Sequence, residues 1–342
     1  LINEDQKSFK NLNNKKINLI NVEYNFKKCF EKISNRSNDY IEKSFQIALK
    51  IVNKNKFSKL IAGTMSWGVW GINFNGVEMQ RMIENTVDLG ISSFDHADIY
   101  GGYTTESAFG DAFSKTDISR PNVQFISKCG IQLKTPNRSN TLKHYNCSKD
   151  YIISSAEASL KHLKTEYLDL LLIHRPSPLM DPYEVMEAVY HLKKEGKIIN
   201  FGVSNFTPSQ VDLLLREVTV GANQIEFSVV QHQALFDGCL DQLLTHKITP
   251  MAWAPLGTIF SVEMTPQKTR ILEVLETLSR LYSARPDQLL LAWILKHPSG
   301  IHPVIGSTNL ERIKAASEAI SVNLTTEDWF KLLEASQGYE VP

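Results

Sequence analysis

The chain has 342 residues, 42% of them hydrophobic, which is enough to bury a sizeable core in one large domain or two smaller ones. Because 37 basic side chains balance 37 acidic ones, the composition indicates neither a nucleic acid nor an anionic membrane surface as a partner. Apolar runs such as Leu168–Ile173 are far shorter than the roughly 20 residues of a membrane-spanning helix, and the cysteines form no CxxC pair, as expected of a cytoplasmic protein with free thiols.

Residues 1–43 differ from the rest of the chain. They are rich in Asn and Lys, contain neither Gly nor Pro, and scatter their apolar residues among polar ones. We expect an N-terminal extension that is partly disordered, with one short amphipathic helix at 24–33. An organelle-targeting segment is the alternative. The folded domain is expected to comprise residues 44–342.

From residue 44 the pattern changes to alternating strands and helices. Residues 45–52 and 57–65 flank an NKNK turn and predict a hairpin that closes the bottom of the fold and leads into a first apolar strand at 60–65. Further strands are expected at 91–94, 123–128, 168–174, 198–203, 222–226, 250–253 and 302–305. Helices are expected at 77–89, 105–113, 151–163, 182–195, 208–216, 240–245, 266–282, 286–296 and 310–319.

Several helix starts carry a capping side chain followed by proline at the first helical position: Asp181 with Pro182, Thr207 with Pro208, and Thr265 with Pro266. Eight strand–helix units follow one another, and their short, almost wholly apolar strands are typical of parallel strands covered on both faces. Eight units in roughly 280 residues predict a (β/α)8 TIM barrel. A doubly wound open sheet is the competing architecture, but no GxGxxG follows the first strand.

A barrel builds its active site at the carboxyl ends of its strands. If the residues there share one mouth, it holds a phenol, an ammonium, an imidazole, a carboxylate and an indole. In chain order these residues are Gly63, Thr64, Met65, Asp95, Tyr100, Lys128, His174, Ser204, Asn205, Gln224, Trp253, Gly306 and Ser307.

These residue types suggest proton donation to a developing alkoxide. A free tyrosine has a pKa of about 10, and the ammonium of Lys128 close to Tyr100 is expected to lower that pKa and make a usable general acid. Asp95 would keep the ammonium charged, while His174 would hydrogen-bond the substrate oxygen or share the proton. The hydride must then come from a reduced nicotinamide, which could stack on Trp253.

From residue 44 onward the chain resembles the aldo-keto reductase superfamily, and closely its bacterial-type oxidoreductase branch. The motifs that carry the resemblance are FDHADIYGGY (94–103), ISKCGI (126–131), LLIHRPSPLMD (171–181), FGVSNF (201–206) and the GYEVP ending. The superfamily's catalytic tetrad falls on Asp95, Tyr100, Lys128 and His174, with no member missing. The resemblance implies an NADPH-dependent reductase of aldehydes or ketones.

The resemblance also implies a binding site for NADP(H). The nicotinamide-holding residues fall on Ser204, Asn205, Gln224 and Trp253, with Gly63, Thr64 and Met65 lining the same ring. The loop that covers the pyrophosphate falls on Pro255, Leu256 and Gly257, and the adenosine 2′-phosphate site on Ser307, Thr308 and Arg312. A hydroxyl, a helix N-terminus and a guanidinium together favour a phosphate.

The chain departs from the family pattern beside this phosphate site. Where many members carry lysine just before the serine, this chain has Gly306, and the later acidic and amide positions are Ala315 and Ala316. The loss of a positive charge weakens the expected preference for NADPH over NADH, although Arg312 still favours the phosphate.

Other readings of the same residues remain open. A Schiff-base aldolase also uses a barrel lysine, but a paired Asp95 would keep Lys128 charged. A metal hydrolase would need clustered ligands, and no HxH or HExxH is present, so no metal is expected. Barrels of this family also serve as potassium-channel beta subunits, so a nicotinamide-binding barrel that regulates a partner protein is the main alternative function.

Some neighbouring residues are expected to have a structural role or have no assigned role. Cys129 is expected to point to the other side of its strand from Lys128 and to pack rather than react. His96 and Asp98 flank the site without an assigned role. Loops at 132–146 and 258–264 and the C-terminal tail are expected to select the small-molecule carbonyl substrate. The oligomeric state is left open, with a monomer as a workable expectation.

Overall fold

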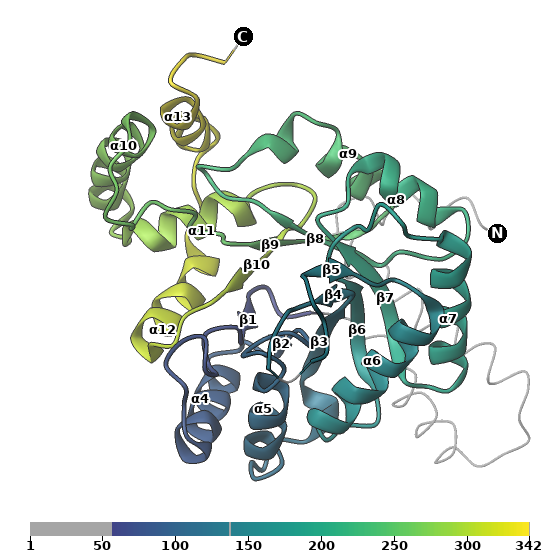
Figure 1. Cartoon of the computed structure of the whole chain (residues 1–342). Coiled ribbons are helices and arrows are strands. Elements are labelled where there is room, and N and C mark those ends of the chain that lie inside the picture. The colour runs from purple at the N-terminus through teal and green to yellow at the C-terminus, as the bar shows by residue number, and fades with distance from the viewer. Residues whose placement is uncertain (1–56, 137, 342) are drawn as a thin grey trace, which may run out of the picture. The chain divides into compact units, whose positions relative to one another are not determined.

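The computed structural model describes residues 57–136 and 138–341, which include a closed barrel of eight parallel strands (Figure 1). The strand order around the barrel is β1-β10-β9-β8-β7-β6-β3-β2. The predicted (β/α)8 architecture is therefore confirmed. The strand bounds are β1 (Ile61–Gly63), β2 (Ser93–Asp95), β3 (Gln124–Cys129), β6 (Leu168–Ile173), β7 (Ile198–Ser204), β8 (Ala222–Glu226), β9 (Thr249–Trp253) and β10 (His302–Ile305).

Helices follow the barrel strands and pack around them (Figure 1). Each helix predicted from residue 77 onward is present, with ends that agree within about two residues, the usual uncertainty of helix boundaries. The predicted N-terminal extension, with its short helix at 24–33, lies outside the described residues. Among the described residues, no helix is long and apolar enough to cross a membrane. The bounds are α4 (Gly76–Asp88), α5 (Thr105–Phe113), α6 (Lys149–His162), α7 (Pro182–Lys194), α8 (Pro208–Leu215), α9 (Cys239–Thr245), α10 (Pro266–Tyr282), α11 (Pro286–Leu295) and α12 (Leu310–Glu318).

The capping residues act as predicted. Asp181, Thr207 and Thr265 each accept a hydrogen bond from a backbone N–H in the first turn of the following helix, with proline at its start. These bonds satisfy amides that have no partner within the helix. Asn75 forms a similar cap at the start of α4, and its own backbone N–H donates in return to the Glu78 carboxylate.

The structure differs from the predicted elements near the first barrel strand and after the last one. Of the predicted strand at 57–65, only Ile61–Gly63 is extended and paired, in parallel with β2 and β10. The other predicted hairpin arm, 45–52, and the proposed boundary at 43/44 lie outside the described residues. The C-terminal tail, expected to be a loop, instead forms helix α13 (Thr326–Gln337), capped by Thr325.

Helix α13 is held against two other helices beside the barrel. It packs along α10 (Figure 1), and Arg270 Nε donates to the Ala335 carbonyl at 2.8 Å. Trp293 of α11 and Trp329 of α13 stack with ring centroids 4.8 Å apart, and each indole N–H donates to the other's carbonyl. These contacts explain why a terminal segment of ordinary composition is a stable helix here.

Side chains alternate between two cores along each strand. On β3, Ile126 belongs to a cluster with Ile61, Leu170 and Met251 that fills the barrel interior. Cys129 belongs instead to the larger cluster between strands and helices. Lys128, two residues after Ile126, therefore points into the barrel, which is how a charged group reaches the centre of the fold.

The close approach of α5 to α6 depends on Gly110. A Cβ at this position would lie 2.1 Å from the His162 carbonyl oxygen. We predict that Gly110→Ala lowers the free energy of unfolding by about 1–3 kcal/mol, measured by urea denaturation, although alanine otherwise stabilises a helix interior by about 0.5–1 kcal/mol over glycine.

The matched control is Gly76→Ala at the first residue of α4, where the nearest atom to an added Cβ is 3.9 Å away. This variant is expected to be as stable as the wild type or slightly more so. Equal unfolding free energies for the two variants would contradict the steric explanation.

Candidate active site

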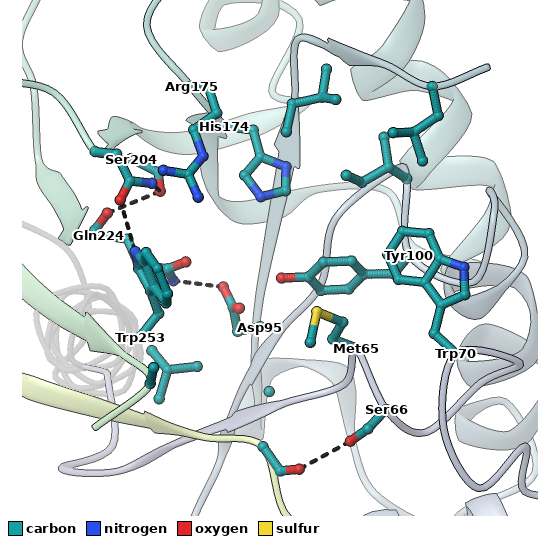
Figure 2. A pocket seen from close by; sticks show the side chains of 18 of the residues that line it. Met65, Ser66, Trp70, Asp95, Tyr100, His174, Arg175, Ser204, Gln224 and Trp253 are labelled. Carbon is teal, nitrogen blue, oxygen red and sulfur yellow. Dashed lines mark hydrogen bonds between the residues drawn. The ribbon is translucent and has the colours of Figure 1, made fainter. Parts of the chain in front are cut away.

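A cavity of about 610 Å³ opens at the carboxyl ends of the barrel strands (Figure 2). Its wall contains residues from the ends of β1, β2, β7, β8 and β9, together with His174 directly after β6. The sequence-predicted residues that line it are Gly63, Met65, Asp95, Tyr100, His174, Ser204, Asn205, Gln224, Trp253, Pro255 and Gly306. The barrel thus brings most of the predicted site into one mouth.

Lys128 lies directly beneath this cavity and is almost wholly buried. Its Nζ donates to Asp95 Oδ2 at 2.7 Å, to the His96 carbonyl at 2.8 Å and to Tyr100 Oη at 3.1 Å. Three acceptors match the three protons of the ammonium. The chemistry-bearing group at the surface of the cavity is therefore Tyr100, and Lys128 acts on it from below.

The Asp95 carboxylate is held through both of its oxygens. Oδ2 accepts from Lys128, and Oδ1 accepts from Gln224 Nε2 at 2.9 Å. A buried charge pair is favourable only when its remaining lone pairs are satisfied in this way. Gln224, predicted from the family as a nicotinamide contact, thus also fixes the buried ion pair.

The ionisation of Lys128 and Tyr100 reflects burial and mutual contact. Burial favours the neutral amine of Lys128, but Asp95 and Tyr100 outweigh it, so its pKa is raised above 10.5. Burial also raises the pKa of Tyr100 above 10, and the opposing effect of Lys128 is smaller. Lys128 lowers the pKa of Tyr100, as predicted, but burial, whose depth the sequence could not show, outweighs that effect and the net shift is upward.

The consequence is a phenol that stays protonated through the neutral range and faces the cavity. A protonated phenol is a proton donor, and the neighbouring ammonium stabilises the phenolate that remains after donation. The geometry suits protonation of an oxygen that gains negative charge during a reaction.

His174 is neutral and lies beside Tyr100. Their ring centroids are 6.1 Å apart at an interplanar angle of 79°, and both side chains face the cavity (Figure 2). Burial lowers the pKa of His174 well below 6.5, and nearby cations lower it further. Nδ1 is buried and receives no hydrogen bond from residues 57–136 or 138–341.

A chain of hydrogen bonds fixes the opposite wall. Trp253 Nε1 donates to Asn205 Oδ1 at 2.8 Å, and Asn205 Nδ2 donates to Ser204 Oγ at 2.8 Å. Ser204 Oγ then donates to the Gln224 carbonyl at 2.9 Å. Asn205 has φ of 61°, a left-handed conformation that asparagine tolerates better than most residues. The indole therefore presents a defined surface to the cavity.

A second cavity of about 310 Å³ adjoins the first, since both are lined by Ala254, Pro255 and Gly306. Its wall includes the predicted residues Leu256, Gly257, Ser307 and Arg312. In the described part of the chain, no carboxylate lies within ion-pair distance of Arg312, whereas Asp287 in the same wall is paired with Arg285 at 2.9 Å. A cavity lined by the Trp253 indole next to one lined by a guanidinium that has no ion-pair partner among the described residues fits a dinucleotide.

Two predicted cofactor residues lie outside both cavity walls. Thr64 is wholly buried and hydrogen-bonds the Asp95 carbonyl and His96 Nδ1. Thr308 does not line either cavity. Thr64 thus supports the site rather than forming its surface.

The neighbours without an assigned role prove to be structural. His96 packs edge-on against Phe109, and burial lowers its pKa to about 3. Asp98 accepts from Tyr151 and Ser155, and burial raises its pKa to about 7. Cys129 is buried on the outer side of β3, as predicted, and burial raises its thiol pKa.

The predicted residues omit part of the cavity wall. The additional residues are Ser66, Trp70, Ile99, Ile131, Leu133, Lys143, Tyr145, Arg175, Ala254 and Val304. Arg175 follows His174 directly and was detectable from that position. Lys143 and Tyr145 belong to the loop expected to select the substrate, which contains the short antiparallel pair β4 (Ile131–Gln132) and β5 (His144–Tyr145).

Comparisons with known proteins agree with this geometry. Residues 59–337 match the model of the aldo/keto reductase family. The chain is 42% identical to an uncharacterised oxidoreductase, YcsN, of Bacillus subtilis, over 86% of this chain and 99% of that protein. It is also 42% identical to the oxidoreductase YdhF of Escherichia coli (84% and 96% covered), and 35% identical to a 6-dehydroglucose reductase of Agrobacterium fabrum (83% and 97%).

A crystal structure of a thermostable aldo-keto reductase, Tm1743, superposes with a TM-score of 0.69 at 24% identity, covering 81% of this chain and 94% of that chain. That likeness shows the fold. The match to the family model and the sequence relatives go further: this chain belongs to the aldo-keto reductase family of oxidoreductases.

No group of three or more His, Cys, Asp or Glu side chains that could hold a metal occurs among the described residues.

The buried ion pair yields a prediction on stability. Lys128→Met leaves the Asp95 carboxylate buried without its cation, and we expect the free energy of unfolding to fall by about 3–5 kcal/mol in urea denaturation.

The double variant Lys128→Met/Asp95→Asn is the control. It removes the unpaired charge, so it should be more stable than the single Lys128 variant. A double variant that is less stable than the single one would show that the loss does not come from an unpaired carboxylate.

Proposed function

We propose that this chain is an NADPH-dependent carbonyl reductase that converts aldehydes or ketones to alcohols, with Tyr100 as general acid. The main support is the position of Tyr100 Oη, which faces the cavity 3.1 Å from a buried, ion-paired ammonium. The 6-dehydroglucose reductase among the relatives is consistent with a carbonyl substrate.

Most of the proposed cofactor residues line the two adjacent cavities, whereas Thr308 lines neither. Ser204, Asn205 and Gln224 would hold the nicotinamide carboxamide, with the ring on Trp253. Pro255, Leu256 and Gly257 would cover the pyrophosphate, and Ser307, Thr308 and Arg312 would bind the 2′-phosphate. When bound, the reduced nicotinamide supplies the hydride.

The tetrad performs the proton chemistry. Tyr100 donates its phenolic proton to the substrate oxygen as negative charge develops there, and the Lys128 ammonium stabilises the resulting phenolate. Asp95 keeps that ammonium charged and in place. The neutral His174 positions the same substrate oxygen by a hydrogen bond.

Tyr100→Phe tests the assignment of the acid. It removes the proton donor and retains the ring, so kcat for aldehyde reduction should fall by about 10²–10⁴-fold, measured from NADPH absorbance. NADPH affinity, measured by fluorescence titration, should stay near the wild-type value. A variant with intact turnover would show that another group donates the proton.

Arg312→Ala tests the cofactor preference. Hydrogen bonds to a charged group contribute about 1.5–3 kcal/mol, so the Kd for NADPH should rise by about tenfold to a hundredfold. NADH, which lacks the 2′-phosphate, is the internal control and should bind the variant as it binds the wild type. An equal loss for both cofactors would refute a specific phosphate contact.

A further inference from the structure

The wall of the active-site cavity carries more positive than negative charge. Among its lining residues Asp95 is the only carboxylate, and its charge is already balanced by Lys128. Two further cations, Arg175 and Lys143, line the same cavity. Neither lies within ion-pair distance of a carboxylate in residues 57–136 and 138–341.

The guanidinium N–H groups of Arg175 are available to bind a ligand. Its guanidinium carbon is 5.5 Å from the centroid of the Trp253 ring, and the side chain lies between His174 and Ser204 in the cavity (Figure 2). No hydrogen bond joins it to another side chain or carbonyl in the described part of the chain. A guanidinium presents a planar fork of donors that matches a carboxylate.

Lys143 reaches the same cavity from a different element. It directly precedes β5, which pairs with β4 through Ile131 with Tyr145 and Gln132 with His144. This pairing holds the loop at the mouth. Both Lys143 and Arg175 contribute to the lowered pKa of His174, so both charges act close to the proposed position of the substrate oxygen.

The proposed cofactor contacts do not use these two cations. The residues proposed to bind the pyrophosphate and the 2′-phosphate, such as Gly257 and Arg312, line the second cavity, and Arg175 and Lys143 do not. The wall near the substrate position is otherwise largely apolar, with Trp70, Ile131 and Leu133. A fitting ligand has an apolar body and an anionic end.

We propose that the preferred substrates are aldehydes or ketones that carry a carboxylate, bound by Arg175 and Lys143; this inference rests on the proposed carbonyl reductase function. In the reaction the carbonyl carbon gains a hydride from NADPH, which is oxidised to NADP⁺. The carbonyl oxygen gains the proton of Tyr100, and the C=O double bond becomes a single bond. The carboxylate is unchanged and serves only in recognition.

The experiment compares 4-carboxybenzaldehyde with 4-formylbenzamide, an uncharged compound of nearly the same shape, at saturating NADPH. The amide withdraws electrons more strongly, so intrinsic reactivity favours it over the carboxylate. We expect kcat/KM to be higher for the carboxylate by about tenfold to a hundredfold, the effect of one charged hydrogen-bonded contact. Added salt should reduce this ratio.

Arg175→Met and Lys143→Met should each lower the ratio of the two kcat/KM values by about fivefold or more. A loss of general structural integrity would affect both substrates and leave their ratio unchanged. Because Lys143 is exposed, its variant tests the proposal even if the Arg175 variant folds poorly. The control is Lys161→Met in the last turn of α6, away from the cavity, which should keep the wild-type ratio.

Each outcome bears on one of the two proposals. Equal kcat/KM for the two aldehydes would overturn the anionic substrate class and leave the reductase function standing. A preference that survives in both cation variants would overturn the roles of Arg175 and Lys143. No NADPH-dependent reduction of either aldehyde, or of simple aldehydes such as butanal, would overturn the reductase function itself.

Discussion

The active site depends on one buried ion pair. Lys128 and Asp95 are almost wholly removed from solvent, and their charged atoms are 2.7 Å apart. Burial alone favours the neutral amine of Lys128, so its ammonium stays charged because Asp95 and Tyr100 are in contact with it. Gln224 donates a hydrogen bond to the second carboxylate oxygen of Asp95. The His96 carbonyl and Tyr100 Oη accept the two other hydrogen bonds of the ammonium.

The barrel supplies the rigidity that this pair requires. Asp95 and Lys128 lie on the neighbouring strands β2 and β3, which are paired in parallel, and both side chains point inward. His174 follows β6, the next strand around the barrel. Because the register of paired strands sets which residues face each other, the same hydrogen bonds that close the barrel also place the tetrad.

The two adjoining cavities contain regions that differ in charge. A protonated phenol and a neutral imidazole lie above the buried ion pair, where the proposed proton transfer occurs. The guanidinium of Arg312, which has no ion-pair partner among the described residues, lies in the adjoining cavity, where we propose that it binds an anionic cofactor group. Arg175 and Lys143 give the substrate side a positive charge of its own, which is the basis for the inferred preference for carboxylates.

The sequence alone determined the barrel and most of its site. Capping residues such as Thr207 and short apolar strands act locally, so eight units could be counted without coordinates. The tetrad residues could be proposed because they lie at or just after strand ends, in motifs that resemble those of the aldo-keto reductase superfamily. Helix α13 was not predicted, since its stability comes from contacts such as the stacking of Trp329 on Trp293, which are distant in sequence.

Only the tertiary structure decided the properties that depend on depth and on distant neighbours. The pKa of Tyr100 is raised rather than lowered because burial exceeds the effect of Lys128, and burial is set by the whole fold. Thr64 lies behind the cavity wall, and Lys143 enters it through the pairing of β4 with β5. Residue type and spacing specify the chemical groups available to a site; packing determines their exposure, their charge and which of them meet.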